Sequence, residues 1–273
     1  MKKVLLTIAA LIGLASALPA SAWTQRPNFP PQQCAALVPW GIPQVAKASA
    51  TPICRQGYFS LFDNQAKIPV WGAWVVTPQN VNGCVPRSNA FAADQSIPAS
   101  ATPADYAATG YDKGHNANDA HQSWDQQVEY ESFLMTNMMP QLPGLNRGIW
   151  KLLETATGAW TFESQGPVVV YSGPIYSVAK DKKIGNGVDV PYGFYKIVYI
   201  SKTNTLLAFL FPHKENQGND LTVVQTTVAD IEGNTGIVFP IPPGHVKTVK
   251  EVMPPVNFAN VAAAKKKTCG RSD

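Results

Sequence analysis

The amino-acid sequence predicts an α+β domain with a largely antiparallel central sheet. Segments 57–63 and 67–77 are rich in β-branched and aromatic residues, and the stretch "NQAK" at their junction is typical of a hairpin. Segments 192–201 and 205–212 have a similar composition and are joined by "KTN". Segment 146–156 instead has apolar residues spaced for one face of a helix. Hairpin-forming strands combined with separate helices predict this fold class.

The remaining segments complete a single domain without internal repeats. Residues 23–50 form an irregular lead-in, and residues 80–111 form a long loop, which in a compact domain is often functional. The stretch "SWDQQVEYESFLM" has helical character, and we expect that helix to continue until Pro140 ends it. Residues 167–173 predict a further strand, while residues 222–236 suit either helix or strand.

The N-terminal segment has the layout of a cleaved export signal. Two lysines precede an apolar stretch from Val4 to Leu18, and "ASA" ending at Ala22 supplies a cleavage site. The apolar stretch is shorter than a membrane-spanning helix usually needs. We therefore expect residues 1–22 to be removed, leaving one exported domain at 23–273 without a membrane anchor, which is either periplasmic or secreted.

The overall charge does not indicate a polyanionic partner. The formal charge of +4 falls to +2 when the two lysines of the signal are removed. Nucleic-acid binding would therefore depend on local basic clusters. Two such clusters, each equally compatible with a solvated surface, are Lys180 with Lys182 and Lys183, and residues 265–267.

Four cysteines predict two disulfides in an oxidising compartment. They are Cys34, Cys54, Cys84 and Cys269, and the sequence alone leaves three pairings open. We favour Cys34 with Cys54, which are close in sequence, and Cys84 with Cys269, which would fasten the C-terminal tail. Their spacing matches no zinc-binding pattern.

One of the four histidines has neighbours suited to catalysis. Lys113 lies two positions before His115, so in an extended segment both side chains project on the same face. Gly114 between them permits a close backbone approach. A neutral imidazole beside a fixed cation suits attack by water on an anionic phosphodiester, and we expect Lys113 to lower the pKa of His115. The other histidines are interpreted as structural or surface residues: His121, His213 and His245.

A second group of polar residues lies on the helix predicted at 146–156. Asn146, Trp150 and Glu154 recur every four residues and share one side of the helix. The oxygen atoms of Asn146 and Glu154 are the ligand type that Mg²⁺ prefers, and Mg²⁺ usually keeps several waters. Eight residues of regular helix span about 12 Å, so Glu154 would act through a metal-bound water. The alternative is that Asn146 only caps the helix and Glu154 is solvated.

Three motifs in this order resemble the signature of the DNA/RNA non-specific endonucleases, which are ββα-metal (His-Me finger) nucleases. They are "YDKGHNANDA", "ESFLMTNMMPQ" and "LNRGIWKLLE", and the resemblance extends from "GYFSLFD" to "GNTGIVFP". It implies a ββα-metal motif within the fold. It also implies hydrolysis of DNA, RNA or both to 5′-phosphate products, with Mg²⁺ as the cofactor and Mn²⁺ as a substitute.

The resemblance also implies a role for each matching residue. His115 would be the general base that activates water, and Asn146 would bind the metal directly. Glu154 would hold metal-bound waters, and Asn137 would orient the site. Arg87 follows the "PVWGAWVV" strand, where the family often has an arginine that stabilises the charged phosphorane.

Lys113 departs from the family pattern, in which most members have arginine. Arginine binds phosphate with a bidentate fork, whereas lysine provides a point charge. The alternative function is therefore a catalytically weakened, exported nucleic-acid-binding protein. A structural protein of the cell envelope would suit the disulfides and export signal but would have no use for His115, Asn146 and Glu154. The sequence leaves the oligomeric state and the choice between DNA and RNA open.

Overall fold

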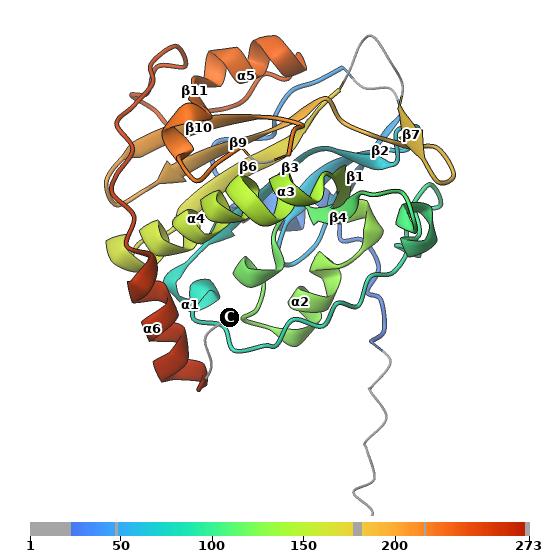
Figure 1. Ribbon diagram of the computed structural model, residues 1–273, viewed down its shortest axis with the longest axis horizontal. Helices are drawn as coiled ribbons and strands as arrows, with labels where there is room; N and C mark the ends of the chain where they lie inside the picture. The colour runs from blue at the N-terminus through green and yellow to red at the C-terminus, as the bar shows by residue number, and fades with distance from the viewer. Residues whose placement is uncertain (1–22, 47–48, 177–181, 216, 271–273) are drawn as a thin grey trace, which may run out of the picture.

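Seven strands form the central sheet in the order β1-β2-β3-β6-β9-β10-β11, and every neighbouring pair is antiparallel (Figure 1). The computed structural model describes residues 23–46, 49–176, 182–215 and 217–270. The strands of the sheet are β1 (Ala50–Cys54), β2 (Phe59–Asp63), β3 (Ile68–Val76), β6 (Val168–Ile175), β9 (Gly193–Ile200), β10 (Thr205–Pro212) and β11 (Gln225–Thr226). This arrangement confirms the predicted α+β fold with an antiparallel sheet.

Both predicted hairpins occur in the sheet. Strands β2 and β3 pair around the "NQAK" turn, and β9 pairs with β10 along its whole length around "KTN". The segment that suited either helix or strand contains both, because β11 is followed by α5 (Val228–Thr235). Outside the central sheet, β7 (Lys183–Ile184) and β8 (Val188–Asp189) form a separate antiparallel pair.

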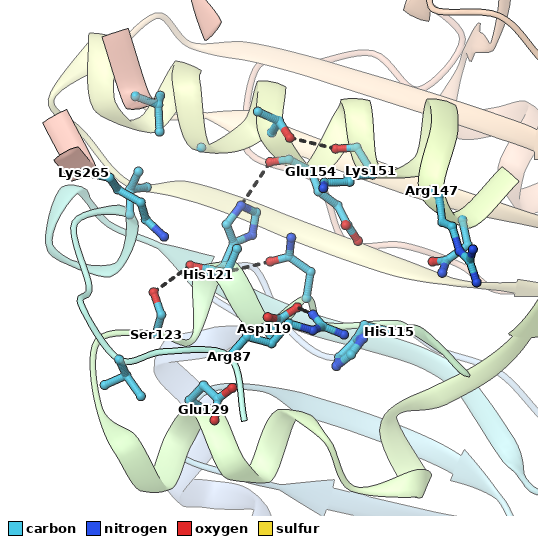
Figure 2. A pocket seen from close by; sticks show the side chains of 18 of the residues that line it. Arg87, His115, Asp119, His121, Ser123, Glu129, Arg147, Lys151, Glu154 and Lys265 are labelled. Atoms are coloured by element: carbon cyan, nitrogen blue, oxygen red, sulfur yellow. Dashed lines mark hydrogen bonds and ion pairs between the residues drawn. The ribbon is translucent and has the colours of Figure 1, made fainter. Parts of the chain in front are cut away.

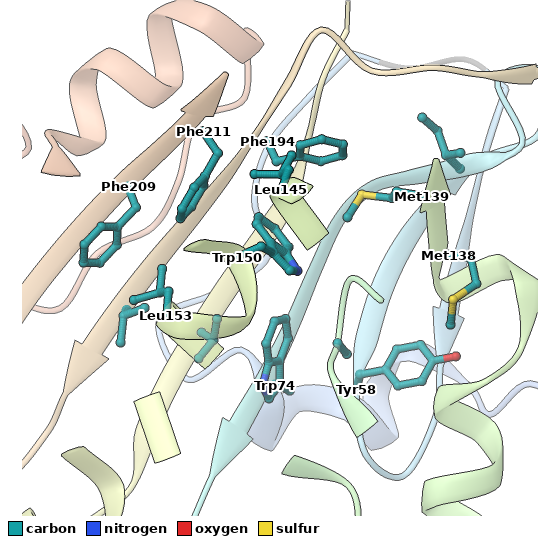
Figure 3. Packing of buried hydrophobic residues seen from close by; sticks show 14 of the residues in the cluster. Tyr58, Trp74, Met138, Met139, Leu145, Trp150, Leu153, Phe194, Phe209 and Phe211 are labelled. Carbon is teal, nitrogen blue, oxygen red and sulfur yellow. The ribbon is translucent and has the colours of Figure 1, made fainter. Parts of the chain in front are cut away.

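The sheet is buried on both faces. One face packs against the long helix α4 (Lys151–Ser164), with Trp74, Trp150 and Phe194 in its core (Figure 3). The other face packs against α5 and the short 3-10 helix η1 (Pro31–Leu37), around Trp71 and Tyr195. Trp71, Trp74 and Trp150 are each 1% exposed and fill the core.

The sequence was misleading about the helix before Pro140. Asp125 is the N-cap of helix α2 (Gln126–Ser132), and its carboxylate accepts hydrogen bonds from two backbone amides. The helix ends eight residues before Pro140. A 3-10 turn, η4 (Met135–Asn137), follows, and Pro140 lies inside strand β5 (Met138–Gln141). Strand β5 pairs only with β4 (Asp112–His115) in this two-stranded ladder, where a proline is tolerated. Pairing with β4 therefore overrides the local helical pattern.

The helix predicted at 146–156 is longer and is not regular. It begins with α3 (Pro143–Leu145), passes through a π-helical turn, η5 (Asn146–Trp150), and continues as α4. Gly148 in this turn has φ −99° and ψ −117°, outside the helical region. The distance expected for a regular helix between Asn146 and Glu154 therefore does not apply. Strands β4 and β5 followed by this helix form the ββα unit.

Two disulfides join Cys34 to Cys54 and Cys84 to Cys269, which confirms the favoured pairing. The remaining short helices are α1 (Pro78–Val81), η2 (Pro103–Tyr106), η3 (Asp119–His121), η6 (Leu221–Val223) and the C-terminal α6 (Phe258–Cys269). Within the described ranges, no helix has the length and apolar character that crossing a membrane requires. The predicted export signal at 1–22 lies outside the described residues.

Candidate active site

A pocket of about 770 Å³ lies between the ββα unit, the loop after α1 and helix α6 (Figure 2). Five of the six predicted site residues line it: Arg87, Lys113, His115, Asn146 and Glu154. They come from the long loop, strand β4 and the kinked helix, which are far apart in the sequence. The tertiary structure therefore brings the two proposed groups, one around His115 and one around Asn146, to a single cavity.

Asn137 is the predicted site residue that does not line the pocket. It is 1% exposed, and its Nδ2 donates hydrogen bonds to the carbonyl oxygens of Ala117 and Ser132, both at 2.8 Å. Its Oδ1 accepts a hydrogen bond from the backbone amide of Ala117 at 3.0 Å. The side chain thus holds the segment that follows His115, and its contribution to the site is positional.

Strand β4 presents Lys113 and His115 to the pocket from the same face, as the extended spacing predicted. Gly114 between them lies against Gln141 of β5. A Cβ atom at Gly114 would lie 2.0 Å from Oε1 of Gln141, which no normal contact permits. A side chain at position 114 would therefore have to displace the buried side chain of Gln141.

Two phenylalanines hold the predicted site cations beside His115. The rings of Phe91 and Phe133 pack edge to face, with their centroids 4.9 Å apart. The ring of His115 packs on Phe133 at 4.8 Å, and the guanidinium of Arg87 lies 4.9 Å from the same ring. The Nζ atom of Lys113 lies 4.7 Å from the Phe91 ring. Cation–π attraction and ring packing thus position all three groups, and sequence reasoning did not identify these two aromatic residues.

The imidazole of His115 is held in its neutral form. Its pKa is lowered to about 4, chiefly by burial; the charge of Asp119 opposes this shift, and the charges of Arg87 and Lys196 add to it. Lys113 is not among these causes, so the expected origin of the pKa shift was wrong. Asp119, on η3, forms an ion pair with Arg87 in the pocket. Among the described residues, Nε2 of His115 is buried and has no hydrogen-bond partner.

Asp112 fixes the orientation of Asn146. The Nδ2 atom of Asn146 donates a hydrogen bond to the Asp112 carboxylate at 2.9 Å, and Arg147 donates two more at 2.7 and 2.8 Å. A carboxylate accepts only, so the amide nitrogen of Asn146 must face Asp112 and its oxygen must point elsewhere. Asn146 has helical backbone angles and follows α3 directly, so it is not the N-cap of this helix, and the alternative interpretation of this residue is wrong.

Lys196 of β9 fixes the carboxylate of Glu154. Its Nζ donates a hydrogen bond to Oε1 of Glu154 at 2.9 Å and lies 3.9 Å from the centre of the Trp150 ring. The backbone carbonyl of Glu154 lies 3.1 Å from Nε2 of His121, whose Nδ1 is 3.3 Å from Nε1 of Trp74. Since the indole only donates, His121 donates from Nε2 to Glu154. Glu154 is therefore held at both its side chain and its backbone, rather than simply solvated.

The other two histidines make structural contacts outside the pocket lining. Nε2 of His213 accepts a hydrogen bond from the backbone amide of Leu142, just before α3, at 2.9 Å. His245 pairs with Glu251 at 2.5 Å near the surface. Of the predicted basic clusters, Lys183 pairs with Asp189. Lys265 lines the pocket, whereas Lys180 lies outside the described residues.

The oxygen atoms in the pocket suit a hydrated cation rather than an all-protein metal cage. In the part of the chain that the structure describes, no group of three or more His, Cys, Asp or Glu side chains could hold a metal ion. Asn146 turns its amide oxygen away from Asp112. Glu154 binds Lys196 through Oε1, so its second oxygen, Oε2, is not used in that contact. One amide oxygen and one carboxylate oxygen fit Mg²⁺, which commonly binds few protein ligands and retains its waters.

The fold and site match one family of nucleases. A profile of the DNA/RNA non-specific endonucleases matches residues 42–241. The chain belongs to this family. Bovine mitochondrial endonuclease G is 29% identical over 220 residues, which cover 74% of this chain and 72% of the relative. A nuclease from Nostoc is 30% identical over 200 residues, covering 68% of this chain and 71% of the relative.

A solved structure supports the same assignment. A chain in the crystal structure of the EndoG/EndoGI complex superposes with a TM-score of 0.69 at 27% identity. The match covers 76% of this chain and 91% of that chain. The protein is therefore a nuclease that acts on nucleic acids, as its three motifs predicted. Helix α6, which forms part of the pocket wall, lies beyond the 42–241 match.

Proposed function

We propose that this endonuclease is an exported enzyme that uses Mg²⁺, or Mn²⁺ in its place, to hydrolyse DNA, RNA or both, with His115 as its general base. The observation that supports this proposal is the single pocket shared by His115, Lys113, Arg87, Asn146 and Glu154. It combines a neutral base, two cations and two oxygen ligands around one cavity. These are the components that hydrolysis of a phosphodiester requires.

The imidazole of His115 takes a proton from a water molecule on the pocket side. Its lowered pKa keeps the ring unprotonated at neutral pH and therefore able to accept that proton. The water oxygen then forms a bond to phosphorus while the bond to the 3′ oxygen breaks, which leaves a 5′-phosphate. Packing against Phe133 and Phe91 keeps the ring in place during this transfer.

Arg87 and Lys113 would face the negative charge that grows on the phosphate in the transition state. Asn146 and Glu154 would hold the metal, the first directly and the second through its waters. A bound Mg²⁺ or Mn²⁺ would supply positive charge that stabilises the negative charge of the reacting phosphate. Because all of these contacts are to phosphate, they carry no sequence information, which fits a non-specific endonuclease.

Export is supported by the cysteines and by the N-terminal sequence. Two disulfides are typical of an oxidising compartment, and residues 1–22 have the composition of a cleaved signal. We therefore place the domain at 23–273, in the periplasm or outside the cell. Mitochondrial location is a property of bovine endonuclease G and other relatives, and nothing in this chain requires it.

A cleavage assay tests the proposal. Purified protein is incubated with supercoiled plasmid and with RNA, with Mg²⁺ and with EDTA, and His115→Ala is compared with His245→Ala, a change outside the pocket. We expect degradation that EDTA stops and that His115→Ala slows by at least about a hundredfold, the scale of a lost general base. Full activity in EDTA would contradict the metal role. Salt-dependent binding without cleavage under any divalent ion would favour the catalytically weakened alternative.

A further inference from the structure

Helix α6 forms the wall of the pocket at the end away from His115. Phe258, Val261, Ala262 and Lys265 of this helix all line the cavity. Figure 2 shows Lys265 and His115 at opposite ends of the pocket, with His121 between them. Figure 1 shows α6 beside α1 and one end of α4. Helix α6 lies beyond residues 42–241, which the family profile matches.

Lys265 is the residue of α6 that is most deeply buried. It is 7% exposed, whereas Lys266 and Lys267 on the same helix are exposed. Lys265 lines the same cavity as His121 and Glu154. An ammonium group has three donors, so it can bind a phosphate oxygen alongside its protein contacts. Its position therefore suits a negatively charged ligand that enters the pocket.

The Cys84–Cys269 disulfide fastens α6 to the loop that carries Arg87. Cys269 is the last residue of the helix, and Cys84 lies three positions before Arg87. At the other end, Nε1 of Trp160 on α4 donates a hydrogen bond to the carbonyl of Pro254 at 3.3 Å. Both ends of the C-terminal segment are thus attached to elements that form the site. These attachments hold Lys265 at the pocket.

We propose that Lys265 is a second phosphate-binding group, which contacts a backbone phosphate next to the scissile one, and that the Cys84–Cys269 disulfide holds it in place. The inference rests on the proposed function, because it places the scissile phosphate at His115. A strand bound there extends along the pocket towards α6. The cations at Arg87, Lys113 and Lys265 would then follow the charged backbone across the cavity.

Binding and cleavage by Lys265→Ala, compared with Lys266→Ala, test this role. Binding of a fluorescent single-stranded oligonucleotide is measured in EDTA, so the readout does not depend on catalysis. We expect Lys265→Ala to weaken binding about tenfold, the scale of one charged hydrogen bond. It should also reduce the slope of log affinity against log salt by about 0.7. Lys266→Ala, which removes an exposed charge of the same kind, should change the affinity less than about twofold.

A minimal substrate separates binding from damage to the site. Bis(4-nitrophenyl) phosphate has no neighbouring phosphate, so Lys265→Ala should hydrolyse it at the wild-type rate while its KM for the oligonucleotide rises. Equal effects of the two lysine variants, or an equal loss on both substrates, would overturn the inference. A wild-type protein that binds the oligonucleotide through Lys265 but cleaves nothing would refute the proposed function alone.

The disulfide is tested in the same binding assay. Cys84→Ser/Cys269→Ser should weaken oligonucleotide binding by about as much as Lys265→Ala, since α6 loses one of its two attachments. Adding Lys265→Ala to that double variant should then have little further effect, because both changes remove the same contact. Fully additive losses would show that the disulfide does not act through Lys265.

Discussion

The Nζ atom of Lys196 lies 2.9 Å from Oε1 of Glu154, in a position where the lysine side chain is 1% exposed. On β9, Lys196 lies two positions from Phe194 and from Val198, so all three side chains project from the face of the sheet that packs against α4. Burial lowers the pKa of Lys196, and the charge of Glu154 opposes that shift. The sheet thus provides a buried cation that orients a residue proposed to hold the metal.

Replacing Lys196 by methionine should destabilise the protein and impair the site. Removing one partner of a buried ion pair costs about 3 kcal/mol, because the other charge is left unpaired. Denaturant unfolding measures this loss, with Lys202→Met on the exposed β9–β10 turn as the control. Lys196→Met/Glu154→Gln, which removes both charges, should recover much of the stability but not the activity. An unfolding free energy of Lys196→Met equal to that of the wild type would contradict the pairing.

The pH dependence of the imidazole follows from its burial. The pKa of His115 is lowered to about 4, so the ring is neutral above that pH and loses its role as a base as the pH falls through 4. The unfolded chain titrates near 6.5, so His115 contributes stability above that value which is lost towards pH 4. An NMR titration of the metal-free protein, with His115→Gln to assign the signal, checks this. Titration of His115 between pH 6 and 7 would contradict it.

Asp112 should control the affinity for the metal without touching it. Asp112→Ala frees the amide of Asn146 to rotate and releases Arg147, so the proposed ligand oxygen loses its orientation. Loss of such a supporting partner typically weakens metal binding by 10- to 100-fold. Calorimetric titration with Mn²⁺ measures the change, and Asp220→Ala, which removes an exposed carboxylate at the N-cap of η6, serves as the control. Unchanged Mn²⁺ affinity in Asp112→Ala would refute this role.

The Cys34–Cys54 disulfide should affect stability but not catalysis. It closes a loop of about 20 residues, for which chain entropy predicts a contribution of about 3 kcal/mol. Both cysteines belong to the core on the face of the sheet opposite α4 and line no part of the pocket. Cys34→Ser/Cys54→Ser should therefore unfold at lower denaturant concentration while its kcat at low temperature stays near that of the wild type. A large fall in kcat with unchanged unfolding would contradict this separation.

The sequence by itself determined the features that depend on local patterns or on motifs. Strand periodicity and short turns located the β2–β3 and β9–β10 hairpins, and proximity suggested the cysteine pairing. The three motifs indicated the family and pointed to His115, Asn146 and Glu154. The strand patterns, the turns and the motifs can be read from the sequence because each one is formed by residues that are close together in the chain.

Only the tertiary structure decided how these groups are held and what surrounds them. Asp112 and Asn146 are 34 residues apart, and Lys196 is 42 residues from Glu154. Neither contact has a periodicity that a single sequence could reveal. The helical pattern continues to Pro140, but residues Met138–Gln141 form a strand because they pair with β4. Burial among Phe91, Phe133 and neighbouring charges, rather than the adjacent lysine, lowers the pKa of His115. These properties depend on chain segments that become neighbours only on folding.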